Sequence, residues 1–163
     1  MSWNGQGSLE RLWQEEECNC MKQEAWSLGE PYVCGYYMGY PAIEEVRHYM
    51  RDLDFEERLS VISQGFHRGI SIVRCYSMEE FAAAVGKRED SDPTGGVRTL
   101  DWGELLPWLR DTIGDAALAD VVEAIVKNGG LEAEIIDTFR VMLFVRMNQY
   151  HEVLADYKTS VDG

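Results

Sequence analysis

The segment 131–158 constrains the fold of this chain more than any other part of the sequence. Acidic residues near its start and Lys158 at its end match the polarity of a helix dipole. The middle of the segment is apolar on nearly all sides, through Ile135, Ile136, Phe139, Val141, Met142, Leu143, Phe144 and Val145. An apolar surface all round is typical of a helix that other elements surround. We therefore predict a long central helix, with a homodimer contact through this helix as the alternative.

Two shorter helices are expected immediately before this one, over 102–113 and 116–128. Both carry apolar stripes at helical spacing, and Asp115 can cap the second. Pro107 lies inside the first, so we expect a kink or a late start there. We predict that both helices pack on the 131–158 helix to form the core.

The part of the chain before residue 86 mixes helical and extended patterns. Helical spacing of apolar residues, with capping residues and glycines at the ends, predicts helices over 8–28, 41–53, 55–67 and 77–85. The β-branched run at 70–76 is the best strand candidate. Its expected partner is the tyrosine-rich segment 32–38.

These expectations describe a mainly α fold of about seven helices around a long C-terminal helix, with at most one short two-stranded β-ribbon (32–38 with 70–76). A chain of 163 residues is expected to form a single domain, 1–163. The charged loop 86–99, rich in glycine, would divide it into subdomains 1–85 and 100–158.

The formal net charge is −14, and it is spread evenly along the chain. Residues 1–81 carry 14 acidic and 7 basic side chains, and residues 82–163 carry 15 and 8, so each half has a net charge of −7. Such a field repels nucleic acid and anionic membranes and attracts basic proteins. Direct nucleic-acid binding is not expected, because no basic stripe is present. A surface that is acidic for solubility alone is the alternative.

The sequence also predicts that the chain does not enter a membrane. No run approaches the roughly 18 apolar residues that a membrane span needs. The first ten residues, MSWNGQGSLE, lack the basic region of a signal peptide. We expect a cytoplasmic protein.

Tyrosines and acidic clusters lie close together in the first part of the chain. Tyrosine is favoured in the cores of protein interfaces, although a loop that covers the core is the alternative for these tyrosines. We predict that the partner-binding residues are Glu15, Glu16, Glu17, Tyr36, Tyr37, Tyr40, Glu44, Glu45, Asp52, Asp54, Glu56 and Glu57. The hypothesis is a non-enzymatic interaction or regulatory protein that binds a basic protein partner. In its sharpest form, the chain is an inhibitor that mimics nucleic acid and occupies a nucleic-acid-binding channel.

The segment 44–48, Glu-Glu-Val-Arg-His, resembles the E-E-x-R-H helix signature of ferritin-like di-iron carboxylate proteins. The resemblance implies Glu45 and His48 as iron ligands in the core of a helical bundle. That family also needs a second Glu-x-x-His, and the nearest pattern here is Asn148-x-x-His151. At about 100° per residue, Glu45 and His48 lie away from the apolar face of their helix. The alternative is a solvated face with local ion pairs, among them Glu44–Arg47.

Four cysteines are present, at 18, 20, 34 and 75. A zinc or redox site of Cys18, Cys20 and Cys34 is the alternative function, although a C-x-C spacing inside a helix points the two thiols apart. Buried thiols that pack as small hydrophobes are the structural alternative, and Cys75 in the strand candidate fits it. No nucleophile or phosphate-loop motif is found. We therefore predict no cofactor, and binding rather than catalysis, with a small enzyme of unrecognised type as the alternative.

Overall fold

The computed structural model describes residues 32–33, 35–65, 69–86 and 96–162, and every structural statement below concerns these residues. The chain forms two compact units, Met1–Gly39 and Tyr40–Gly163. The expected helix over 8–28 lies outside the described residues. The division into subdomains on either side of 86–99 stays a prediction.

The described part of the first unit is a small antiparallel ribbon. Strands β1 (Tyr32–Val33) and β2 (Tyr36–Tyr37) pair so that Tyr32 lies opposite Tyr37. Gly35 connects them with a φ of +81°, a conformation that glycine adopts without the strain of a side chain.

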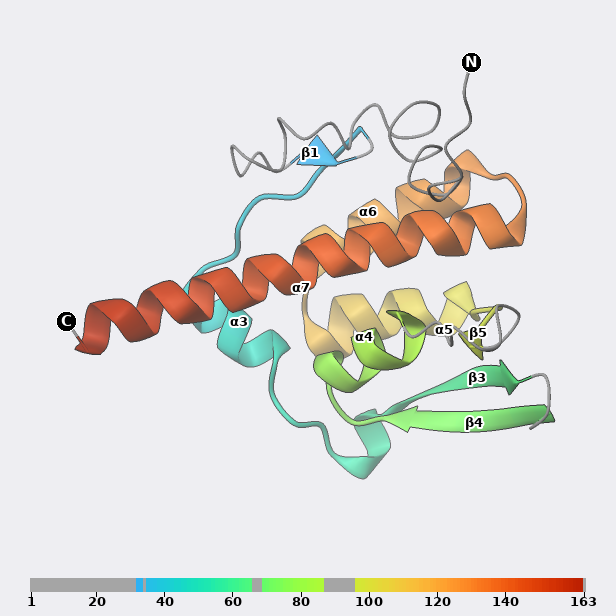
Figure 1. Ribbon diagram of the computed structural model, residues 1–163, viewed down its shortest axis with the longest axis horizontal. Helices are drawn as coiled ribbons and strands as arrows, with labels where there is room; N and C mark the ends of the chain where they lie inside the picture. The colour runs from blue at the N-terminus through green and yellow to red at the C-terminus, as the bar shows by residue number, and fades with distance from the viewer. Residues whose placement is uncertain (1–31, 34, 66–68, 87–95, 163) are drawn as a thin grey trace, which may run out of the picture. The chain divides into compact units, whose positions relative to one another are not determined.

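The second unit is built around α7 (Glu132–Asp162), which crosses the whole unit in Figure 1. Helices α3 (Ile43–Tyr49), α4 (Met78–Gly86) and α6 (Ala116–Asn128) all contact it. The prediction of a long central helix is therefore confirmed, and so are the helices predicted over 77–85 and 116–128. Within the described residues no helix is both long and apolar enough to cross a membrane.

Helix α4 lies between α7 and a three-stranded antiparallel sheet with the order β4-β3-β5 (Figure 1). The strands are β3 (Leu59–Gly65), β4 (Gly69–Cys75) and β5 (Gly96–Val97). Phe81 of α4 packs against two other aromatic rings, since its ring centroid lies 5.2 Å from that of Trp108 and 6.0 Å from that of Phe139 in α7. The core is thus aromatic where α4 meets α7.

The prediction of a helix over 55–67 is wrong. A 3₁₀ turn, η2 (Phe55–Glu57), is followed at once by strand β3. The apolar residues here follow a period of two at the start of the strand, because Leu59 and Val61 are buried and Ser60 and Ile62 are exposed. Phe55, which the helical interpretation placed in the core, is 66% exposed.

The strand predicted at 70–76 is confirmed, but its predicted partner, 32–38, is wrong. Strand β4 pairs along its whole length with β3, from Leu59 opposite Cys75 to Gly65 opposite Gly69. A hairpin between segments that are close in sequence closes a much shorter loop than a ribbon with 32–38 would. Because 55–67 holds a strand and 8–28 lies outside the described residues, those residues contain five α-helices where the expected total was about seven.

Two further helices depart from their predicted bounds. Helix α3 ends at Tyr49, before the predicted residue 53, and Leu53 donates its N–H to the carbonyl of Tyr76 at 2.7 Å. The irregularity predicted at Pro107 takes the form of a change of helix type. Helix α5 (Trp102–Pro107) continues as a π-helical turn, η3 (Trp108–Ile113), since proline cannot donate to the usual α-helical bond.

A buried ion pair connects α6 to the middle of α7. Asp115 is fully buried and Arg146 is 2% exposed, and the guanidinium donates two hydrogen bonds of 2.7 Å to the carboxylate. Asp115 also caps α6 by accepting from the N–H of Leu118 at 3.1 Å, and it accepts from the Tyr150 hydroxyl. The third guanidinium nitrogen donates to Gln149 at 2.7 Å. Both charges are therefore satisfied inside the core.

We predict that Arg146→Met lowers the free energy of unfolding by about 3–5 kcal/mol, because it leaves the Asp115 carboxylate buried without its cation. Arg110→Met is the matched control, since Arg110 pairs with Asp120 at 2.7 Å on the surface, where solvent screening leaves such pairs a small effect on stability. Urea titration followed by circular dichroism measures both. Equal losses in the two variants would contradict the importance given to the buried pair.

A second prediction concerns alkaline pH. Burial, followed by the charge of Asp115, raises the pKa of Tyr150 far above its ordinary value of about 10. Above pH 10 the unfolded chain loses this proton while the folded chain keeps it, so stability falls as the pH rises, by at most about 1.4 kcal/mol per pH unit. Tyr150→Phe should remove that part of the slope, and Tyr157→Phe on the exposed end of α7 should not. Urea titrations between about pH 9 and 11.5 test this, and an unchanged slope in Tyr150→Phe would refute it.

Candidate interaction surface

Three arginines of the second unit, Arg51, Arg140 and Arg146, direct their charges to groups within the unit. Arg146 lies in the core beside Asp115. Arg140 of α7 donates to the carbonyls of Val85 and Val97 and to Asp137, which joins α4 and β5 to the central helix. Cations used in this way stabilise the chain's own backbone and do not neutralise carboxylates on the outer surface.

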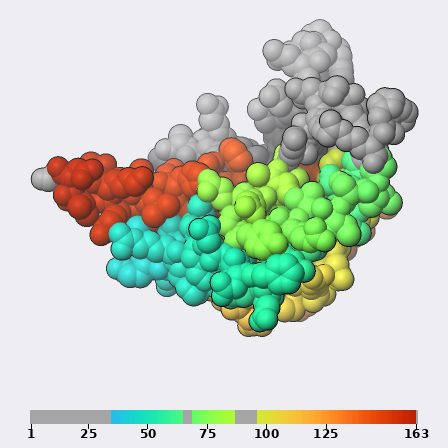
Figure 2. All heavy atoms as spheres, turned by 90° about the horizontal axis from the view of Figure 1, so that it is seen from below, coloured from blue at the N-terminus to red at the C-terminus, as the bar shows by residue number. Residues whose placement is uncertain are grey.

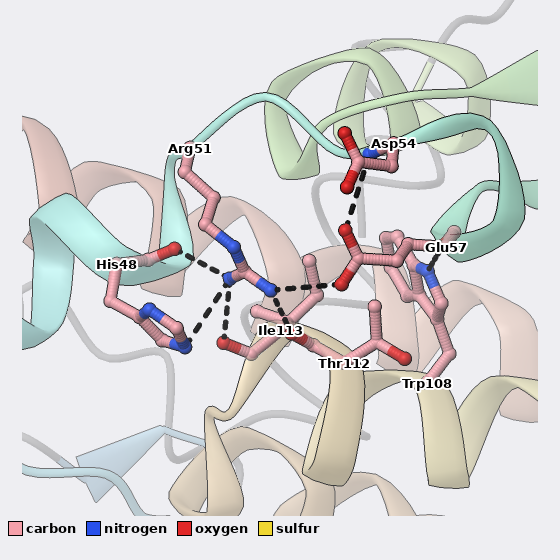
Figure 3. Close-up of polar contacts among 7 residues, drawn as sticks. All are labelled: His48, Arg51, Asp54, Glu57, Trp108, Thr112 and Ile113. Atoms are coloured by element: carbon pink, nitrogen blue, oxygen red, sulfur yellow. Dashed lines mark hydrogen bonds and ion pairs between the residues drawn. The ribbon is translucent and has the colours of Figure 1, made fainter.

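Arg51, just after α3, likewise donates to backbone carbonyls, as Figure 3 shows. Its guanidinium donates to the carbonyl of His48 at 2.8 Å and to those of Thr112 and Ile113 at 2.5 and 3.5 Å. The last two carbonyls end the π-helical turn, where a positive charge is favourable. The same group lies 3.5 Å from the Glu57 carboxylate. One side chain therefore holds α3, the 54–57 turn and the end of η3 together.

Glu57, one of the predicted binding residues, is used inside the structure. Its carboxylate accepts from the N–H of Asp54 at 3.2 Å and faces Arg51, and its carbonyl accepts from the Trp108 indole at 2.8 Å (Figure 3). Asp54, which begins the turn, is exposed, whereas Glu57 makes contacts that stabilise the turn itself.

The other predicted carboxylates of this segment are exposed. We call Glu44, Glu45, Asp52, Asp54 and Glu56 the acidic strip. In the part of the chain that the structure describes, none of the five makes an ion pair with a cation. Figure 2 shows the segment from α3 to β3 as a continuous band of the surface. The strip is therefore a locally uncompensated negative surface.

The ion pair expected between Glu44 and Arg47 is not among the contacts of the described residues. The Arg47 guanidinium lies over the Tyr157 ring of α7, 4.3 Å from its centroid. Glu45 accepts instead from the N–H of Ala42 at the start of its own helix, at 3.2 Å. Stacking thus leaves the Glu44 carboxylate without the partner that sequence spacing suggested.

The Tyr40 side chain contacts an acidic residue of α7. Its hydroxyl donates to Glu152 at 2.6 Å across 112 residues of sequence. This hydrogen bond, followed by burial and by the charges of Glu152 and Asp156, raises the pKa of Tyr40 to about 12. The two α7 carboxylates were missed by the sequence analysis, and no local pattern marks them, because their position depends on how α7 packs.

The remaining predicted binding residues lie elsewhere. Tyr36 and Tyr37 belong to the first unit, where Tyr37 is exposed, and they stay predictions. Glu15, Glu16 and Glu17 lie outside the described residues. Met38, grouped with the tyrosines by sequence, is buried.

The metal hypothesis finds no assembled ligand set in the described residues. Glu45 and His48 are exposed, as the helical spacing predicted, and His48 Nε2 lies 3.3 Å from the Arg51 guanidinium. No group of three or more His, Cys, Asp or Glu side chains that could hold a metal occurs in this part of the chain. Cys75 is buried, and burial raises the pKa of its thiol to about 11. Cys18, Cys20 and Cys34 lie outside the described residues, so a zinc or redox site there stays a hypothesis.

We predict that Arg51→Lys lowers the free energy of unfolding by about 1–3 kcal/mol, because a single ammonium group cannot replace a planar fork that reaches three carbonyls and Glu57. Arg47→Lys, which changes an exposed stacked arginine, should cost less than about 1 kcal/mol. Urea titration of both variants measures the difference. A loss in Arg51→Lys no greater than in Arg47→Lys would show that the carbonyl contacts contribute little.

Comparison with known proteins identifies no relative of this chain. No family model, curated protein or solved structure matches the chain. Its function must therefore be inferred from the chemistry of its own surface.

Proposed function

We propose that this chain is a non-enzymatic binding protein whose acidic strip receives a basic region of a protein partner. The observation that carries the proposal is the contrast between the two kinds of charge. Arg51, Arg140 and Arg146 are directed to backbone carbonyls and buried partners, whereas the five carboxylates of the strip face solvent without cations from the described residues.

Physical chemistry favours such a surface as a recognition site for cations. Like charges held side by side repel each other, which costs stability, and a cationic partner relieves that repulsion. Exposed ion pairs are individually weak, about 0.2–1 kcal/mol each, so useful affinity needs several of them together. Binding of this kind is fast at low salt and weakens as salt is added.

A mimic of nucleic acid is the sharper form of the same proposal. In that form, the carboxylates occupy the places of phosphates in the channel of a nucleic-acid-binding protein, and the chain inhibits that protein. The even charge of −14 supports this form, because the whole molecule would be attracted to such a channel. Competition by DNA separates the two forms.

The test compares two triple variants that remove the same charge. Glu44→Gln, Asp52→Asn and Glu56→Gln neutralise part of the strip. Asp111→Asn, Glu132→Gln and Asp162→Asn neutralise three exposed carboxylates outside it. Each tagged protein is incubated with host lysate at about 50 mM and about 300 mM salt, and bound proteins are quantified by mass spectrometry.

We expect a basic protein to be captured in stoichiometric amount at low salt, and high salt to reduce the captured amount at least tenfold. The strip variant should lose this protein, and the control variant should still capture it. Its displacement by duplex DNA supports mimicry, and its retention in DNA supports a basic surface that does not bind nucleic acid. If the amount of captured partner does not depend on salt, or falls equally with both variants, an electrostatic site at the strip is refuted.

A further inference from the structure

The sheet of the second unit has an edge that its own strands leave open. Strand β3 is the middle strand, bonded to β4 from Leu59 to Gly65. On its other side it pairs with β5 only at Ser63 and Gln64. Every second peptide group between Leu59 and Ile62 points toward this side of β3. In the described residues, no strand lies beside these groups. Such an edge is a template for an added strand.

A hollow of about 360 Å³ lies beside this open edge. After Val97 the chain moves away from β3, so that residues 59–62 form one wall and residues 99–101, with Glu104 and Leu105, form the other. Volumes of about 300–1,000 Å³ are usual for ligand pockets. The space suits a short extended segment and excludes a folded domain.

The hollow combines apolar walls with two carboxylates. Asp101 and Glu104 are both exposed, and neither makes an ion pair with a cation of the described residues. Although Asp101 precedes α5, its side chain makes no capping hydrogen bond. Within the described residues, no cation or capping contact therefore competes with a bound cation for these two carboxylates.

An unusual apolar surface continues from the hollow across the hairpin. Ile62 lines the hollow and lies opposite Ile72 in the register, and Ile70 follows on the same face. These three side chains are 46%, 59% and 71% exposed. Branched apolar residues exposed together on a sheet mark a surface that another chain covers.

We propose that this hollow holds an extended segment of the basic partner, added to the open edge of β3. Its backbone pairs with Leu59–Ile62, its lysine or arginine side chains reach Asp101 and Glu104, and its apolar side chains cover Ile62 and Ile72. Charge selects this occupant, because a second copy of a chain with a net charge of −14 is repelled, whereas a cationic strand is attracted. The inference rests on the proposed function, since it gives the same partner a second contact.

The experiment uses a synthetic peptide, so that it does not depend on the identity of the partner. The probe is a fluorescein-labelled peptide of alternating lysine and valine, and its acidic counterpart alternates glutamate and valine. Binding to the full chain is followed by fluorescence anisotropy at about 50 mM salt, and the site is mapped by amide chemical shifts of ¹⁵N-labelled protein. A third peptide carries N-methyl groups on alternate residues, which removes the donors that pair with a strand edge.

We expect the lysine–valine peptide to shift the amides of residues 59–62 and 99–105 and the acidic peptide to shift none of them. Asp101→Asn with Glu104→Gln should weaken binding about tenfold, and N-methylation by at least as much. The control pair Asp111→Asn with Glu132→Gln should leave the affinity within twofold. Circular dichroism confirms that each variant is folded.

Shifts that map to the acidic strip alone, or equal affinity of the N-methylated peptide, overturn the inference and leave the strip as the binding site. The triple variant of the strip is run with the same peptide. If that variant loses partner capture while the peptide leaves residues 59–62 and 99–105 unshifted, the hollow alone has failed. If the variant still captures the partner, the proposed function has failed.

Discussion

The contact between Asp115 and Arg146 is the interaction on which the rest of the second unit depends. Asp115 caps α6, and Arg146 lies at the middle of α7, so one bidentate pair fixes how these helices meet. Tyr150, which donates to the same carboxylate, also packs its ring 5.7 Å from that of Tyr49 in α3. The ion pair thus connects α6 to α7, and the Tyr150 ring connects α3 to the same part of α7. Removing water from two ions is costly, and the hydrogen bonds that surround both groups are what make the arrangement stable.

The same use of arginine explains the character of the surface. A chain with few cations can either spread them among its carboxylates or use them to join its elements. Here Arg51 and Arg140 join elements of the unit, since each donates to backbone carbonyls of distant segments. Consequently these arginines do not neutralise the carboxylates of the acidic strip.

Much of the helical framework could be predicted from the sequence, because caps, glycines and apolar stripes act locally. The bounds of α6 were predicted correctly, and α7 extends only a few residues beyond its prediction. The error at 55–67 arose because Phe55, Leu59 and Ile62 also fit a helical stripe, and only pairing with β4 decides between the two periods. The outward positions of Glu44, Glu45, Asp52, Asp54 and Glu56 followed from their charge. The inward use of Glu57, the bond between Tyr40 and Glu152, and the hollow beside β3 could not be predicted, because each depends on segments far apart in sequence.

The acidic strip has one more consequence, which concerns how such a protein changes over time. Within the described residues, the carboxylates of Glu44, Asp52 and Glu56 make no ion pair or hydrogen bond, whereas Arg51 and the buried Asp115–Arg146 pair hold the elements of the unit together. Substitutions on the strip therefore change the surface charge, and with it the proposed attraction of a basic partner, while leaving the scaffold intact. A lineage that faces a changing partner can adjust these positions one at a time, without first acquiring mutations that restore a damaged core.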